Sequence, residues 1–304
     1  MMKNSIKLSV NTGFAVNRII NNEKFAQFVK NNLKIEYIQP TSDWLNLFMS
    51  NKYTYKNVIN LNKILNRYNI KVNSCFTGAF TRLNHLAHPD KDQQKYWINY
   101  FKNFIDLSID LGANYVGSHL GILSYDDNKN KKRNNILVKR VIRNWHILGE
   151  YAYKKKLKSL IWEPMSISRE FGETINECKK IQILLNKKKP SNFKLCLDVG
   201  HGDINSKNKK DYDPYYWLNS FVKESPVVHI KQVHKGSFGH LPFTKKNNSK
   251  GIVDAKKIIK IIQKKKNEDT ELAFELSFKE RDPIDKNVKN DVISSVKYWK
   301  KFLY

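Results

Sequence analysis

The chain has 304 residues, 40% of them hydrophobic, and a formal net charge of +27. This apolar content excludes an intrinsically disordered chain, and no run approaches the about 18 apolar residues that a membrane span needs. The first residues do not have the pattern of a signal peptide, and the three cysteines have no CxxC spacing. We therefore expect a cytoplasmic protein without a membrane partner.

Two explanations fit the large positive charge. The charge comes mainly from lysines that are scattered along the chain beside many asparagines, as AAA- and AAT-type codons of an AT-rich genome would give. A basic chain can also bind nucleic acid, but we expect no specific nucleic-acid partner. Under either explanation the surface attracts anions, including phosphorylated metabolites.

Short apolar segments alternate with longer helical patterns from one end of the chain to the other. Most of the segments are apolar throughout, which is typical of parallel strands buried on both faces. The predicted strands are Ile6–Val10, Lys34–Gln39, Ile70–Phe76, Tyr115–His119, Ser159–Glu163, Lys194–Asp198, Val227–Lys231 and Leu272–Leu276. The clearest predicted helices cover 97–111, 136–153, 254–266 and 288–303, where apolar residues recur every three or four positions. The polar stretches Asp126–Asn135 and Lys245–Lys250 are predicted to be exposed loops.

Eight strand–helix units of roughly 38 residues each predict an α/β fold, a (β/α)₈ TIM barrel that forms a single domain over residues 1–304. A doubly wound open sheet of eight strands is the alternative. No G-x-G-x-x-G motif follows the first strand, so the dinucleotide-binding version of that sheet has no support.

Each of the last four predicted strands carries one ionisable residue at or near its carboxyl end: Glu163, Asp198, His229 and Glu275. In a TIM barrel these ends form the active-site face. Taken alone, His229 could be a core histidine, and Glu275 could form a simple salt bridge with Lys231 or Arg169. A buried carboxylate is, however, normally paired or bound to a metal, and four successive strand ends favour one shared metal site. Three carboxylates and one imidazole favour Mn²⁺, Mg²⁺ or Co²⁺ over a thiolate-type zinc site.

This series of Glu, Asp, His and Glu resembles the metal tetrad of the xylose-isomerase-like TIM barrels, and most of all the ketose 3-epimerases of the tagatose and psicose type. Asp198-Val199-Gly200-His201 is similar to the D-x-x-H motif of that family, in which the histidine helps to hold the substrate. The resemblance implies a divalent cofactor, Mn²⁺ in the first place. It also implies that Glu163 and Glu275 bind this metal and act as an acid–base pair on a ketose or ketose phosphate. A homo-oligomer is compatible with it.

The segment after Glu163 is longer than in the free-sugar epimerases, and with residues 77–85 it is similar to the tetrulose-phosphate (erythrulose phosphate) epimerase branch. The phosphate would need cations, and the candidates for substrate binding are Arg169, Lys231 and Lys235, with Arg82 as a further one. Both lysines could equally be surface residues. His119 ends the fourth strand and either lines the pocket or belongs to the core. Residues 239–243 form either a lid or a packed loop.

Two other functions compete with a metal-dependent epimerase or isomerase. The first is a DNA-repair nuclease of the endonuclease IV kind, which the basic charge and His119 favour. That nuclease needs a three-metal cluster and an Asp-x-His pair after the seventh strand, and this pair is absent here. The second is a catalytically inactive scaffold, against which the full tetrad argues. The epimerase hypothesis accounts for the residue types, because two carboxylates on opposite sides of a substrate can remove and return a proton through a cis-enediolate.

Overall fold

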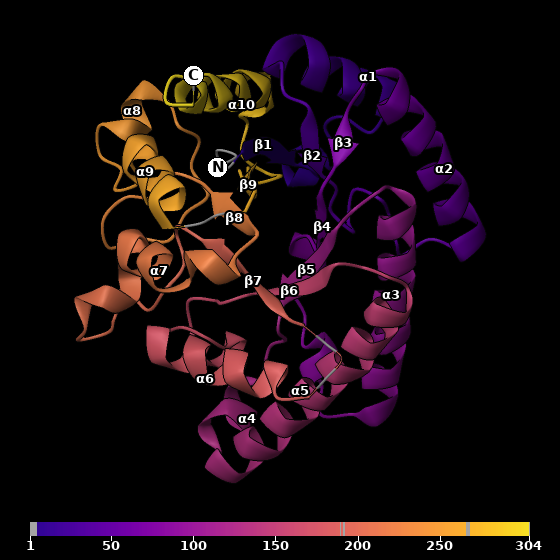
Figure 1. The fold of residues 1–304 in the computed structure, drawn as a ribbon, viewed down its shortest axis with the longest axis vertical. Helices are drawn as coiled ribbons and strands as arrows, with labels where there is room; N and C mark the ends of the chain where they lie inside the picture. Colours follow the sequence, from indigo (N-terminus) through magenta and orange to yellow (C-terminus); the bar gives the residue numbers. More distant parts are fainter. Residues whose placement is uncertain (1–4, 189, 191, 266–267, 304) are drawn as a thin grey trace.

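The structure is a computed structural model that describes residues 5–188, 190, 192–265 and 268–303. Parallel strands occupy its centre and helices surround them (Figure 1). The strands are β1 (Ile6–Asn11), β2 (Tyr37–Gln39), β3 (Lys71–Val72), β4 (Ser74–Phe76), β5 (Tyr115–His119), β6 (Ser159–Glu163), β7 (Lys194–Asp198), β8 (Val227–Ile230) and β9 (Thr270–Phe274). The α-helices are α1 (Asn22–Gln27), α2 (Asn51–Arg67), α3 (Lys91–Asp110), α4 (Tyr125–Lys129), α5 (Lys131–Lys154), α6 (Ile175–Asn186), α7 (Pro214–Phe221), α8 (Lys245–Asn248), α9 (Ala255–Lys265) and α10 (Asp285–Lys300).

The strands close into a barrel. Their order is β3-β2-β1-β9-β8-β7-β6-β5-β4, and every pair is parallel. The two strands at the ends of this order, β3 and β4, are the halves of one predicted strand that is interrupted at Asn73. One half pairs with β2 and the other with β5, and a parallel bridge joins Thr41 to Phe76. The prediction of a TIM barrel is therefore confirmed, and the open-sheet alternative is wrong.

Two details of the predicted elements were wrong. The stretch Asp126–Asn135 is mostly helical rather than a loop: it contains all but the first residue of α4 and the start of α5, and the Asn130 side chain between them caps α5 by accepting from the Arg133 amide. Most of Lys245–Lys250 is likewise the short helix α8. These helices were missed because their residues are mostly polar and exposed, so no apolar period marks them. Of the predicted helix 254–266, the last residue lies outside the described residues.

The alternation of side chains along the strands decides what faces the barrel interior. A buried apolar cluster separate from the main core is formed by Phe76, Tyr115, Ile161, Cys196, Val227 and Ala273. Their strand neighbours pack outward into the main core between strands and helices, as Leu160, Trp162, Val228 and Ile230 do. Residues two positions apart face the same side. The side chains two residues after Ile161, Cys196, Val227 and Ala273 therefore also face inward, one layer nearer the carboxyl ends of the strands, and these are Glu163, Asp198, His229 and Glu275.

Among the described residues, no helix combines the length and apolar character that crossing a membrane requires.

Candidate metal centre

The four strand-end residues predicted to form one site lie together. One ligand atom from each of Glu163, Asp198, His229 and Glu275 can be chosen so that all four atoms are within 4.8 Å of one another. His229 Nδ1 is 2.8 Å from Glu163 Oε1 and 3.7 Å from Glu275 Oε1. The first three side chains are buried, while that of Glu275 is 22% exposed. The β7–β8 register, which pairs Asp198 with His229, helps to produce this convergence.

A lysine is part of the same cluster. Lys231 is 1% exposed, and its Nζ lies 2.6 Å from Asp198 Oδ2 and 3.0 Å from Glu275 Oε2. The sequence suggested this lysine as a phosphate ligand, but the structure places it among the carboxylates. Three carboxylates and one ammonium leave two uncompensated negative charges when His229 is neutral.

The electrostatics of the cluster follow from burial and close charges. Burial raises the pKa of Glu275, but Lys231, His229 and His240 outweigh it and hold the pKa well below its usual range. Burial lowers the pKa of His229, yet the negative charges of Glu275 and Glu163 outweigh it and keep that pKa well above its usual range. The Lys231 pKa is also raised, because Asp198 and Glu275 outweigh its burial. The cations around Glu275 thus favour its ionised form.

The donor set fits a divalent cation. Its three carboxylates and one imidazole are hard ligands, and the two uncompensated negative charges match a dication. Asp198 is oriented by the Gly200 amide, which donates to Oδ1 at 2.6 Å, while its buried Oδ2 has no hydrogen-bond partner among the described residues apart from the ion pair with Lys231. Cys196 is near Glu163 and His229, but burial raises its pKa to about 12, so the sulfur stays a thiol and is a poor ligand.

The cluster opens into a cavity of ≈ 730 Å³ at the carboxyl ends of the strands. Of the predicted substrate-binding residues, Arg82, His119, His201 and Lys231 line this cavity. Arg169 and Lys235 are not among its lining residues, so the structure does not bring them to the site. Other ionisable groups also line it, and these are Asp43, Glu170, His240, Lys279 and Glu280.

The histidines of the cavity differ in their surroundings. His201 Nδ1 lies 3.1 Å from the Pro164 carbonyl oxygen. Its Nε2 faces the tetrad, 3.4 Å from Lys231 Nζ and 3.9 Å from Asp198 Oδ2. His119 is 5% exposed, and burial lowers its pKa to about 4, so it is neutral at pH 7. His240 Nδ1 lies 3.3 Å from Glu275 Oε2. It belongs to the segment 239–243, in which Gly239 and His240 line the cavity and Phe243 is buried in the core.

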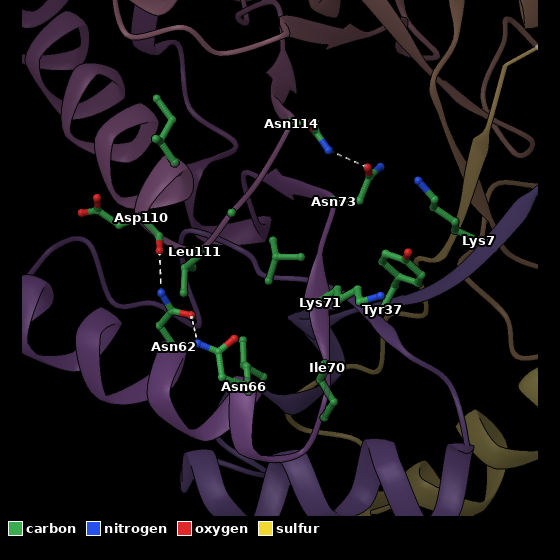
Figure 2. Close-up of a pocket in the computed structure, with 14 residues that line it drawn as sticks. Lys7, Tyr37, Asn62, Asn66, Ile70, Lys71, Asn73, Asp110, Leu111 and Asn114 are labelled. Atoms are coloured by element: carbon green, nitrogen blue, oxygen red, sulfur yellow. Dashed lines mark hydrogen bonds between the residues drawn. The ribbon is translucent and has the colours of Figure 1, made fainter.

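A second cavity of ≈ 530 Å³ lies at the opposite, amino ends of the strands (Figure 2). Its polar lining comes largely from asparagines and lysines, including Lys7, Lys71, Asn73 and Asn114. Among the described residues, the groups of three or more potential metal ligands all belong to the tetrad or overlap with it, so this cavity contains none. The chemistry is concentrated at the carboxyl ends.

Comparison with known proteins identifies the family. Residues 31–300 match the model of the xylose isomerase-like TIM barrel family. The chain belongs to this family, as the strand-end pattern suggested.

Individual relatives narrow the class further. The chain is 36% identical over 299 residues to the D-erythrulose 1-phosphate 3-epimerase of Brucella abortus (strain 2308), covering 97% of this chain and 96% of that protein. A Rhodospirillum rubrum structure with a provisional xylose isomerase name superposes with a TM-score of 0.88 at 24% identity, covering 98% of this chain and 99% of the other. The D-psicose 3-epimerase of Clostridium cellulolyticum H10 gives a TM-score of 0.71 at 12% identity, with coverage of 98% and 99%. These two structural matches support the fold. The expected enzyme class, a sugar epimerase, agrees with the relatives.

Sequence reasoning missed two participants. The approach of His240 to Glu275 and the contact of His229 with Gln39 were not predicted. Lys231 was expected as a substrate ligand or as a salt-bridge partner of Glu275, and the structure gives it ion pairs with both Glu275 and Asp198. Gln39 ends β2 just as Glu163 ends β6, so asking what polar residue ends each strand would have found it. No comparable signal marked His240, which lies in a loop.

Proposed function

We propose that the chain is a divalent-metal-dependent ketose 3-epimerase that acts on a short ketose phosphate, such as a tetrulose phosphate. The observation that carries the proposal is the pair of carboxylates, Glu163 and Glu275, which belong to one buried tetrad and line the same cavity. The similarity to the Brucella erythrulose-phosphate epimerase supports both the reaction and the phosphorylated substrate.

The two glutamates supply the proton chemistry. One glutamate, as the carboxylate, removes the proton from the carbon beside the ketone, and the other, as the carboxylic acid, returns its proton to the opposite face of the planar enediolate. Glu163 has its Oε1 2.8 Å from His229 Nδ1, whereas Glu275 has its Oε2 between Lys231 and His240. Lys231, His229 and His240 hold the pKa of Glu275 well below its usual range despite its burial, which favours the ionised form required of a base.

A divalent ion, when bound, would polarise the ketone and its neighbouring hydroxyl. Glu163, Asp198, His229 and Glu275 would hold it. Lys231 contributes a fixed positive charge on the Asp198–Glu275 side of the cluster, and the Nε2 of His201 can bind a substrate hydroxyl.

The far end of the substrate needs a cation for its phosphate. Arg82 lines the cavity, its side chain is 54% exposed, and it forms an ion pair with the buried Glu170. Lys279 lines the same cavity. A phosphate can bind the guanidinium fork of Arg82 in two-point fashion, with Lys279 as a second charge. We therefore assign the phosphate end to Arg82 and Lys279 rather than to Arg169 and Lys235.

The proposal is tested by a screen of C4 to C6 ketoses and their phosphates in D₂O, with Mn²⁺ present or removed by a chelator. We expect about one Mn²⁺ per chain and solvent deuterium on the carbon beside the ketone. Glu163→Gln and Glu275→Gln should each nearly abolish turnover. Product that carries no deuterium would contradict the two-base reaction, and full activity in the chelator would contradict the metal.

The substrate assignment has a matched pair of variants. Arg82→Ala should raise KM for the phosphorylated ketose by about 10- to 100-fold, since a hydrogen bond to a charged group contributes about 1.5–3 kcal/mol. Arg169→Ala, at an arginine outside the cavity lining, should leave KM within a factor of two or so. Equal kcat/KM on unphosphorylated ketoses would refute the phosphate and leave the epimerase reaction intact.

The nuclease hypothesis loses support. Among the described residues, the groups of potential metal ligands are the tetrad and the set of Glu163, Cys196 and His229, which shares two residues with it. A three-metal cluster needs several further histidines and carboxylates. Efficient cleavage of abasic-site DNA at physiological salt would restore it.

A further inference from the structure

The second imidazole nitrogen of His229 contacts a buried side-chain amide. Nδ1 faces the glutamates of the tetrad, and Nε2 lies 3.0 Å from Oε1 of Gln39, a fully buried residue at the end of β2. A neutral imidazole carries one proton, so the nitrogen that binds a metal must be the one without it. Which nitrogen that is depends on whether Gln39 presents an oxygen or an NH₂ group to Nε2.

A backbone amide decides the orientation of Gln39. The Gly13 N–H can only donate, and it donates to Oδ1 of Asn11 at 2.9 Å. The Nδ2 of Asn11 is thereby turned toward Gln39, where it donates to Oε1 at 2.7 Å. The Nε2 of Gln39 donates in the opposite direction, to the Ser74 hydroxyl at 2.8 Å. The oxygen of Gln39 is therefore the atom that faces His229.

We infer that Asn11 and Gln39 are positioning residues that fix the tautomer of His229, so that Nε2 is protonated and Nδ1 presents its lone pair to the tetrad. The direction of every bond in this series follows from the Gly13 N–H, and the side chains of Asn11 and Gln39 are 5% exposed or less. Water therefore cannot readily compensate for a reversed amide. Partners of this kind orient metal-bound histidines, and their loss typically costs about 10- to 100-fold in metal affinity.

The inference rests on the proposed metal site, and Asn11→Asp provides a test in which two effects have opposite signs. Aspartate has the shape of asparagine and can still accept from Gly13, but its second oxygen cannot donate to Gln39. Gln39 must then turn its NH₂ group toward Asn11 and His229, which forces the proton onto Nδ1. We expect about a tenfold or greater loss of Mn²⁺ affinity, although an added negative charge alone would increase the affinity. Tighter Mn²⁺ binding by this variant would overturn the inference.

A second set of variants uses Gln39 itself. Gln39→Met should weaken Mn²⁺ binding, whereas Gln39→Glu keeps an acceptor toward Nε2 and should retain it. The control is Gln182→Met: Gln182 is also a buried glutamine with hydrogen bonds to Trp162 and Phe193, but it lies outside the site. An equal loss of Mn²⁺ affinity in Gln182→Met would show that losing any buried amide weakens metal binding, and would contradict a specific role of Gln39.

The tautomer can be observed directly by long-range ¹H–¹⁵N spectra, with the His229 signals assigned from His229→Gln. Spectra of the metal-free protein at alkaline pH, where the imidazole is neutral, test the inference even if no metal binds. In the metal-free protein Glu163 Oε1, 2.8 Å from Nδ1, competes with Gln39 for the imidazole proton. The Nε2–H fraction should therefore be larger in the wild type and Gln39→Glu than in Asn11→Asp. An unchanged tautomer in Asn11→Asp and Gln39→Met would refute the inference. Failure of the wild type to bind Mn²⁺ would instead refute the proposed metal site.

Discussion

Replacing Lys231 with methionine tests whether the tetrad is a cluster of like charges that needs cations. The side chain is 1% exposed and compensates Asp198 and Glu275 at 2.6 and 3.0 Å. Removing one partner of a buried ion pair typically costs about 3–5 kcal/mol, because the remaining charges stay buried without compensation. We expect a loss of this size in the free energy of unfolding when a chelator is present.

A bound dication should offset part of that loss. Without the ammonium the site is more negative, so Mn²⁺ should bind the variant about tenfold more tightly than the wild type. Saturating Mn²⁺ should therefore stabilise the variant by about 1.4 kcal/mol more than it stabilises the wild type. Lys235→Met is the matched control, since Lys235 is exposed and its replacement should change stability by no more than about 0.5 kcal/mol.

The assay is urea denaturation of the three proteins with EDTA and with saturating Mn²⁺. The stability deficit of Lys231→Met should also shrink as the pH falls below 4.5, the ordinary pKa of a glutamate. Lys231 and its cationic neighbours hold the Glu275 pKa well below this value, so its contribution to stability is present above pH 4.5 and is lost as the pH falls. A deficit below about 1 kcal/mol in EDTA, or an equal gain from Mn²⁺ in variant and wild type, would refute the reasoning.

Three further predictions concern stability and reactivity. Burial lowers the pKa of His119 from 6.5 to about 4, so the folded protein loses about 3 kcal/mol as the pH falls through this interval, and His119→Gln should reduce the loss measured by denaturation at pH 7 and pH 4. Cys196, fully buried with its pKa raised to about 12, should resist iodoacetamide at pH 8 in the native protein and react in denaturant; rapid native modification, detected by mass spectrometry, would contradict this. Gly117→Ala should lower the free energy of unfolding by about 2 kcal/mol or more, because the added Cβ would lie 2.2 Å from Phe76 Cε2 inside the barrel. Gly239→Ala, whose added Cβ has its nearest contact at 3.5 Å, should be close to neutral when both variants are compared by thermal denaturation.

The sequence by itself determined the barrel and the composition of the tetrad. Parallel strands buried on both faces are apolar runs, and a charged residue at the end of such a run stands out against them. Glu163 and Asp198 each end a predicted strand whose bounds agree with the structure. Since the carboxyl ends of all strands lie on one face of the barrel, their order along the chain was enough to predict that the four residues meet.

Only the tertiary structure decided which polar residues join the tetrad and which do not. Lys231 and Lys235 are four residues apart after the same strand, yet one is buried between two carboxylates and the other is exposed. Gln39 contacts His229 across 190 positions of sequence, through the closed ring of strands. Local patterns report the burial of a strand or helix face, but the partner of a buried polar group depends on strand register and loop path.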